Sequence, residues 1–158
     1  MTVASCRRLR RSGRSGDSLP VPDLAAARYF DREIRSAHTT GELCTAVAQR
    51  AHGQGRDLIA GVLHEFAAEF ADEAALLAAA AVPDGRWPWP LERHIVHTDL
   101  DEAIDAIGDV LEHSERTLRW IARRPDLPAP AAVTFDALAS ARRARRRVLR
   151  VCNEIECL

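Results

Sequence analysis

The sequence predicts an all-α protein, an up-and-down antiparallel bundle of four to five helices. Much of the apolar content is alanine and only 5% of the residues are aromatic, a composition that favours helix over strand. The eight glycines and eight prolines gather in a few places, so long segments without either residue lie between them. In these segments apolar residues recur three and four positions apart, which is the period of an amphipathic helix. Such helices joined by short loops are typical of a bundle.

The chain divides into a tail and one domain. Residues 1–20 consist largely of arginine, serine and glycine, with too little apolar surface to stabilise a fold, and we expect a disordered basic tail there. Residues 21–158 form the predicted helical bundle domain. A chain of 158 residues is long enough for a single domain to bury a substantial core.

Three helices are expected in the first half of the domain. They span about 23–38, 40–52 and 56–82, and the second begins at a cap formed by Thr39 or Thr40. The Gly53/Gly55 break ends the second helix, although isolated glycines leave open a kinked continuation into the third. Glu73 falls in the apolar register of the third helix, where we expect it to lie at the edge of the seam or to pair with an arginine of the first or second helix. The apolar stripes of the three helices are, in order, Leu24, Ala27, Phe30 and Ile34; Leu43, Val47 and Ala51; and Ile59, Leu63, Phe66, Phe70, Leu77 and Ala80.

Two longer helices are expected in the second half, over about 98–124 and 134–157, with Asp99 or Thr98 capping the first. If they pack antiparallel about the proline-rich loop 125–133, Arg145 lies opposite Glu115. The same pairing of helices 56–82 and 98–124 places Glu73 opposite Ile107. The predicted core stripes are Leu100, Ile104, Ile107, Leu111, Ser114, Leu118 and Ile121 for the first helix, and Ala137, Ala141, Ala144, Val148, Val151, Ile155 and Leu158 for the second.

Charge is strongly segregated along the chain. There is no lysine, so all 22 basic residues are arginine. Five arginines and one acid lie in residues 1–19, and six arginines and two acids in 142–158, while the 122 residues between hold 11 arginines and 20 acids. The middle of the chain is therefore acidic and both of its ends are basic.

The arginines of the last helix allow two interpretations. On the predicted register Arg142, Arg143, Arg146 and Arg150 all point outward. The simpler interpretation is a solvated helix face beside an acidic neighbour, with each exposed ion pair contributing about 0–1 kcal/mol. The alternative is a nucleic-acid-binding surface, in which this face and the N-terminal tail bind a phosphate backbone.

Metal binding is a further alternative. His94 and His97 lie three residues apart, which allows both imidazoles to bind one divalent metal if the stretch is helical. Glu65, Glu69 and Glu73 lie four apart on one helix face. The Glu-x-x-His pairs of di-metal bundles are missing, and we predict no cofactor, with a divalent metal at the two histidines as the alternative.

The "WPWP" segment is the most distinctive loop. Its prolines stiffen the backbone, so Trp87 and Trp89 form either a lid on the bundle end or an anchor for a protein partner. The four cysteines form no C-x-x-C pair, and the N-terminus has no apolar signal segment. We therefore expect reduced thiols in a cytoplasmic protein. No stretch of the chain is long and apolar enough to span a membrane, so we expect no membrane partner.

No motif in the chain fixes a chemistry, and we expect a non-catalytic interaction or regulatory protein. Its partner is a protein or a second copy of the chain, because the small residues Ala137, Ala141 and Ala144 allow another helix to approach closely. Two alternatives remain. One is a metal- or small-ligand-binding bundle with enzyme activity, and the other is a nucleic-acid-binding protein.

Overall fold

The computed structural model describes residues 24–80 and 99–156, which form four helices. These are α1 (Leu24–Gly53), α2 (Asp57–Ala80), α3 (Leu100–Ala122) and α4 (Ala129–Glu156). Neither range contains a strand, and the predicted all-α bundle is confirmed. The predicted tail over 1–20 lies outside the described residues. None of the described helices has the length and apolar character needed to cross a membrane.

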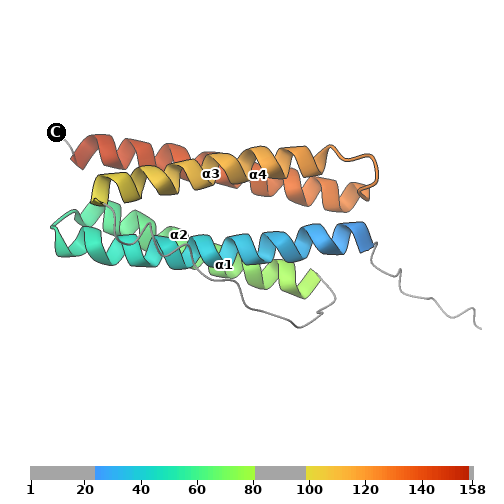
Figure 1. Ribbon diagram of the computed structural model, residues 1–158, viewed down its shortest axis with the longest axis horizontal. Helices are drawn as coiled ribbons and strands as arrows, with labels where there is room; N and C mark the ends of the chain where they lie inside the picture. The colour runs from blue at the N-terminus through green and yellow to red at the C-terminus, as the bar shows by residue number, and fades with distance from the viewer. Residues whose placement is uncertain (1–23, 81–98, 157–158) are drawn as a thin grey trace, which may run out of the picture.

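The four helices form two hairpins that lie against each other (Figure 1). One hairpin is α1 with α2 and the other is α3 with α4; between them, α1 packs on α3 and α2 packs on α4. Helices α2 and α3 therefore occupy diagonal corners of the bundle. The predicted pairing of Glu73 with Ile107 is wrong, because α2 has α4 rather than α3 as its neighbour in the opposite hairpin.

Helix α1 is continuous where the sequence predicted two helices. The Thr40 hydroxyl donates a hydrogen bond to the Ser36 carbonyl 2.8 Å away, so it bonds back within the helix instead of capping a new one. At Gly41 the two helices of the hairpin approach closely, because a Cβ atom there would lie 3.3 Å from the Cβ of Phe70. Tertiary packing thus holds the Thr-Thr-Gly segment in helical form.

The glycines after α1 do end the helix, which decides the question that the sequence left open. Gly55 has a φ of +76°, a left-handed conformation that favours glycine. The Arg56 amide donates back to the Ala51 carbonyl at 2.9 Å, as expected in a glycine-terminated helix. Helices α1 and α2 are therefore separate and joined by a tight turn.

The predicted start and core stripe of α3 are confirmed. Asp99 is the N-cap, and its side chain accepts a hydrogen bond from the Asp101 amide at 2.9 Å. Every residue of the predicted stripe, from Leu100 to Ile121, is buried. The stripe of α2 is also buried from Ile59 to Leu77, with Glu73 in register as predicted.

Helix α4 faces the core with a different side from the predicted one. Val148, Val151 and Ile155 of the predicted stripe are 45%, 52% and 55% exposed. The buried residues of the helix are instead Ala131, Phe135, Ala139, Arg142, Arg145, Leu149 and Cys152. Helix α4 therefore carries two stripes with helical spacing, and the stripe that contains two arginines is the one turned inward. The helix also begins five residues earlier than expected, since Pro130 lies in its first turn, where a missing amide costs little.

Candidate functional site

Arg142 lies at the centre of the bundle and is 1% exposed. Its guanidinium binds both carboxylate oxygens of Glu73 on α2, at 2.7 and 2.5 Å. It also donates to Glu33 on α1 at 2.5 Å and to the Ser114 hydroxyl on α3 at 3.2 Å. One side chain of α4 thus contacts all three other helices. The prediction that Arg142 points outward is wrong, because the buried carboxylates supply the hydrogen bonds that a buried guanidinium requires.

Arg145 extends this buried cluster by one helical turn. Its guanidinium donates to Glu73 at 3.0 Å and to Glu69, which is half exposed, at 2.6 Å. The guanidinium carbons of Arg142 and Arg145 lie 4.3 and 4.4 Å from the centre of the Phe70 ring. Arginine is well suited to this position, because its planar group binds carboxylates in bidentate geometry and also stacks on an aromatic face.

The cluster holds one more carboxylate than guanidinium groups. Glu33, Glu69 and Glu73 face Arg142 and Arg145. Burial raises the pKa of Glu33 to about 7, with Glu73 adding to the rise and Arg142 opposing it. At neutral pH, Glu33 therefore holds a proton part of the time. We call Glu33, Glu69, Glu73, Ser114, Arg142 and Arg145 the ionic cluster.

The predicted ion pair between Arg145 and Glu115 is not formed. Glu115 binds Arg143 of α4 at 3.1 Å instead, because α4 is turned so that Arg145 faces α2. The antiparallel alignment of α3 with α4 is nevertheless close to the predicted one. The sequence placed the two helices correctly along their axes but assigned the wrong face of α4 to the core.

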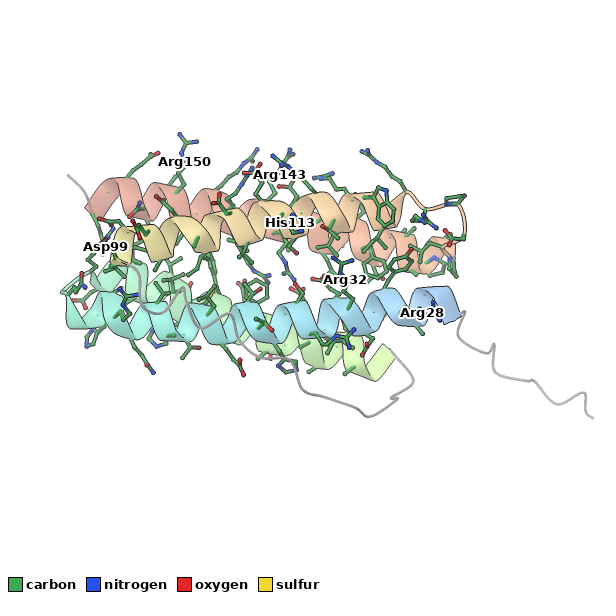
Figure 2. All side chains as sticks on the ribbon, viewed as in Figure 1. Arg28, Arg32, Asp99, His113, Arg143 and Arg150 are labelled. Carbon is green, nitrogen blue, oxygen red and sulfur yellow. The ribbon has the colours of Figure 1, made fainter. Side chains whose placement is uncertain are left out.

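The remaining predicted arginines lie on the outer side of α4. Figure 2 shows Arg143 and Arg150 projecting from α4 away from the opposite hairpin. Arg143 binds Glu115, Arg146 binds Glu112 and Arg150 binds Glu154 at 2.8 Å. Neighbouring carboxylates therefore offset part of the positive charge that the nucleic-acid interpretation assigned to this face.

Two grooves open on the surface of the described bundle. The first has a volume of about 330 Å³ and lies between α1 and α3. Its lining includes Arg32 on α1 and His113 on α3, which Figure 2 labels on the two facing helices, and it reaches Glu33 and Ser114 of the ionic cluster. The second, about 630 Å³, lies between α3 and α4 and is lined by residues of both charges, including Asp105, Arg147 and Arg150.

The predicted metal ligands His94 and His97, and the predicted partner anchors Trp87 and Trp89, lie outside the described residues. Within 24–80 and 99–156, no three histidine, cysteine or acidic side chains are grouped so that they could hold a metal ion. The acidic row on α2 serves a different purpose: Glu65 is exposed, whereas Glu69 and Glu73 bind the two arginines of the ionic cluster.

Glu33 is the residue of the cluster that the sequence analysis overlooked. It lies three positions after Phe30 and one before Ile34, on the inner side of α1, so helical spacing alone marks it as a charged residue in a core register. Glu73 and Arg142 occupy equivalent positions in their own helices. A sequence therefore indicates a buried ionic cluster when two helices carry an acidic residue in their core registers and a third helix carries an arginine in its own.

Cys44 is predicted to be unreactive in the folded protein. Its side chain is fully buried, and burial raises the pKa of the thiol to about 12, so almost no nucleophilic thiolate exists at neutral pH. In a variant with Cys6, Cys152 and Cys157 replaced by serine, iodoacetamide at pH 8 should modify Cys44 only as fast as the protein unfolds. Mass spectrometry checks this, and modification at the rate of a free thiol in the native protein would contradict it.

Comparisons of the chain with protein-family models, with curated proteins and with solved structures find no significant match.

Proposed function

We propose that the protein is a non-catalytic, cytoplasmic interaction protein that self-associates through the exposed apolar side of α4. The observation that carries the proposal is the exposure of Val148, Val151 and Ile155 on a helix that buries two arginines. Exposed apolar residues that form a continuous patch, as opposed to scattered single ones, are typical of interaction sites. We call Ala137, Ala141, Ala144, Val148, Val151 and Ile155 the outer stripe.

The spacing of the outer stripe supports pairing with another helix. Its residues alternate four and three positions apart over the 19 residues from Ala137 to Ile155, and its first and last residues are about 27 Å apart at a rise of 1.5 Å per residue. This is the pattern of a two-helix seam, in which each apolar side chain enters a gap between residues of the facing helix. The alanines of the first half let the two backbones approach closely, while the larger residues of the second half supply apolar area.

Charge favours a parallel arrangement of two α4 helices. At 100° per residue, Asp136, Arg143, Arg147 and Glu154 lie on one flank of the outer stripe. Thr134 and Cys152 lie nearest to the stripe on the other flank, and Arg145, which follows them there, is buried and bound to Glu73 of α2. In a parallel pair the twofold axis runs along the helices, so the exposed charged flank of each copy meets the flank of the other whose arginine is buried. An antiparallel pair would bring the arginines of the two copies together, and like charges in contact are unfavourable.

A charge placed in the outer stripe tests the proposal. Native mass spectrometry of the wild type should show a dimer, and Val148→Glu with Val151→Glu should convert it to a monomer with an unchanged helical circular dichroism spectrum. The matched control is Leu76→Glu, which changes an exposed apolar residue on α2 and should leave the dimer intact. A monomeric wild type at about 50 µM, a twentieth of a 1 mM dissociation constant, would overturn the proposal.

Cysteine cross-linking tests the orientation. In a background with Cys6 and Cys157 replaced by serine, Ala144→Cys and Val151→Cys should each form a disulfide-linked dimer on mild oxidation, since a parallel pair places identical residues opposite each other. Cross-linking at one of these positions and not the other would show an antiparallel pair.

A further inference from the structure

We propose that the groove between α1 and α3 is a binding site for a small organic ammonium compound, whose positive charge lies against Glu33. The groove is separate from the outer stripe, so this site is independent of the proposed self-association. Its volume of about 330 Å³ is at the lower end of the range for small-molecule sites. The lining residues are Arg32, Glu33, Ser36, Asp109, Val110, His113, Ser114 and Thr117.

The inner end of the groove has an excess of negative charge. Glu33 lines the groove, although its side chain is more than nine-tenths buried. Arg142 binds it through one oxygen, Oε1, and Arg142 is shared with both oxygens of Glu73. Three carboxylates of the ionic cluster face two guanidinium groups, and the further cation that acts on Glu33, Arg32, is exposed to solvent. A bound cation would offset the excess negative charge at Glu33, where burial makes an uncompensated charge costly.

The other lining residues fit a small ammonium group better than a bulky or anionic ligand. An ammonium group is a donor of three hydrogen bonds and accepts none. Ser36 and Thr117 contribute hydroxyl groups to the lining of the same groove, and Val110 offers apolar contact for a short carbon chain. Arg32 and Asp109 also line the groove and carry opposite charges, so the two together add no net charge to its lining.

A proton is the competing occupant of this position. The groups that face Glu33 are Arg32 on its own helix, Glu73 on α2, Arg142 on α4, and Asp109 and His113, which line the same groove from α3. Since the pKa of Glu33 is about 7, the ammonium compound must displace a proton below neutral pH. Its affinity should therefore rise about tenfold from pH 6 to pH 8, following the ionised fraction of Glu33.

The experiment is a titration of the ¹⁵N-labelled protein with three probes of equal length, followed by amide chemical shifts. The probes are n-butylammonium, n-butanol and butyrate, which are cationic, neutral and anionic. We expect n-butylammonium to shift the amides of Glu33, Ser36 and Val110 in a saturable manner, and to bind at least tenfold more tightly than either other probe. Equal binding of the three probes, or shifts scattered over other parts of the bundle, would overturn the proposal.

Two variants and one control assign the effect to the groove. Glu33→Gln should weaken n-butylammonium binding at least tenfold and abolish its pH dependence, whereas Glu65→Gln, an exposed carboxylate on α2, should leave both unchanged. Val110→Trp fills the groove and leaves every residue of the ionic cluster unchanged, and it should abolish binding even if Glu33→Gln proves poorly folded. Retention of wild-type affinity in the folded Val110→Trp protein would also overturn the proposal.

Discussion

Replacing Arg142 by methionine is expected to lower the free energy of unfolding by about 3–5 kcal/mol, the cost of removing one partner from a buried ion pair. The substitution leaves Glu33 and Glu73 buried at the centre of the bundle, and of the described arginines of the cluster only Arg145 still reaches Glu73. Urea unfolding followed by circular dichroism measures the loss. Arg150→Met is the control: Arg150 is on the same helix, its side chain is 79% exposed, and its loss should change stability by less than about 0.5 kcal/mol.

Removing the whole buried set should cost much less than removing Arg142 alone. Changing Glu33 and Glu73 to leucine together with Arg142→Met leaves no unpaired charge among these three positions. Apolar replacement of a complete buried ionic set is often neutral or stabilising, because no charge has to be desolvated. The triple variant should therefore be more stable than Arg142→Met by at least about 2 kcal/mol, again on the scale of a buried ion pair. A triple variant less stable than the single one would show that the cost of Arg142→Met comes from lost packing.

The second large effect is a loss of stability as pH rises toward neutrality. The pKa of Glu33 is raised from 4.5 to about 7 in the folded protein, so between these values the native state holds a proton that the unfolded chain has released. The contribution of Glu33 to the free energy of unfolding is therefore fully present below about pH 4.5 and is lost as pH rises through 7. This difference between the two pKa values of Glu33 corresponds to about 3 kcal/mol of folding stability.

Urea unfolding at a series of pH values between 5 and 8 measures this effect, with Glu33→Gln as the comparison. The free-energy difference between the wild type and Glu33→Gln isolates Glu33, because the other titrating groups are common to both proteins. As pH rises across this range, Glu33→Gln should gain about 2–3 kcal/mol of stability relative to the wild type. Glu65→Gln should parallel the wild type throughout. If the wild type instead becomes more stable relative to Glu33→Gln as pH rises, then Arg142 lowers the pKa of Glu33 more than burial raises it.

Sequence periodicity predicted the core correctly in a helix that has only one apolar stripe. In α3 the large aliphatic residues from Leu100 to Ile121 occupy one register, apart from Val110, and half of the positions outside that register are charged, so one face is clearly favoured for burial. In α4 two registers compete, one with alanines and valines and one with Phe135, Leu149 and two arginines. A hydrophobicity pattern assigns arginine to the surface, and so it selected the wrong side of the helix.

The sequence did not predict the ionic cluster because the residues that form it are distant from one another in the chain. Arg142 and Glu33 are 109 residues apart, and Arg142 and Glu73 are 69 apart. The burial of each depends on the others, so no single helix indicates it. The break predicted at Thr39–Gly41 was wrong for a similar reason, since the close contact of Gly41 with Phe70 keeps this segment helical. The sites expected at His94 and His97 and at Trp87 and Trp89 remain predictions.

The central claim is that α4 buries its arginine-bearing stripe and exposes its apolar one. The most direct test is urea unfolding of Arg142→Met beside Val151→Ser, at protein concentrations where the unfolding midpoint does not change with concentration. The structure predicts a loss of about 3–5 kcal/mol for Arg142→Met and less than about 0.5 kcal/mol for Val151→Ser. The reverse order, a large loss for Val151→Ser and almost none for Arg142→Met, would mean that the apolar stripe of α4 lies in the core and would contradict the claim.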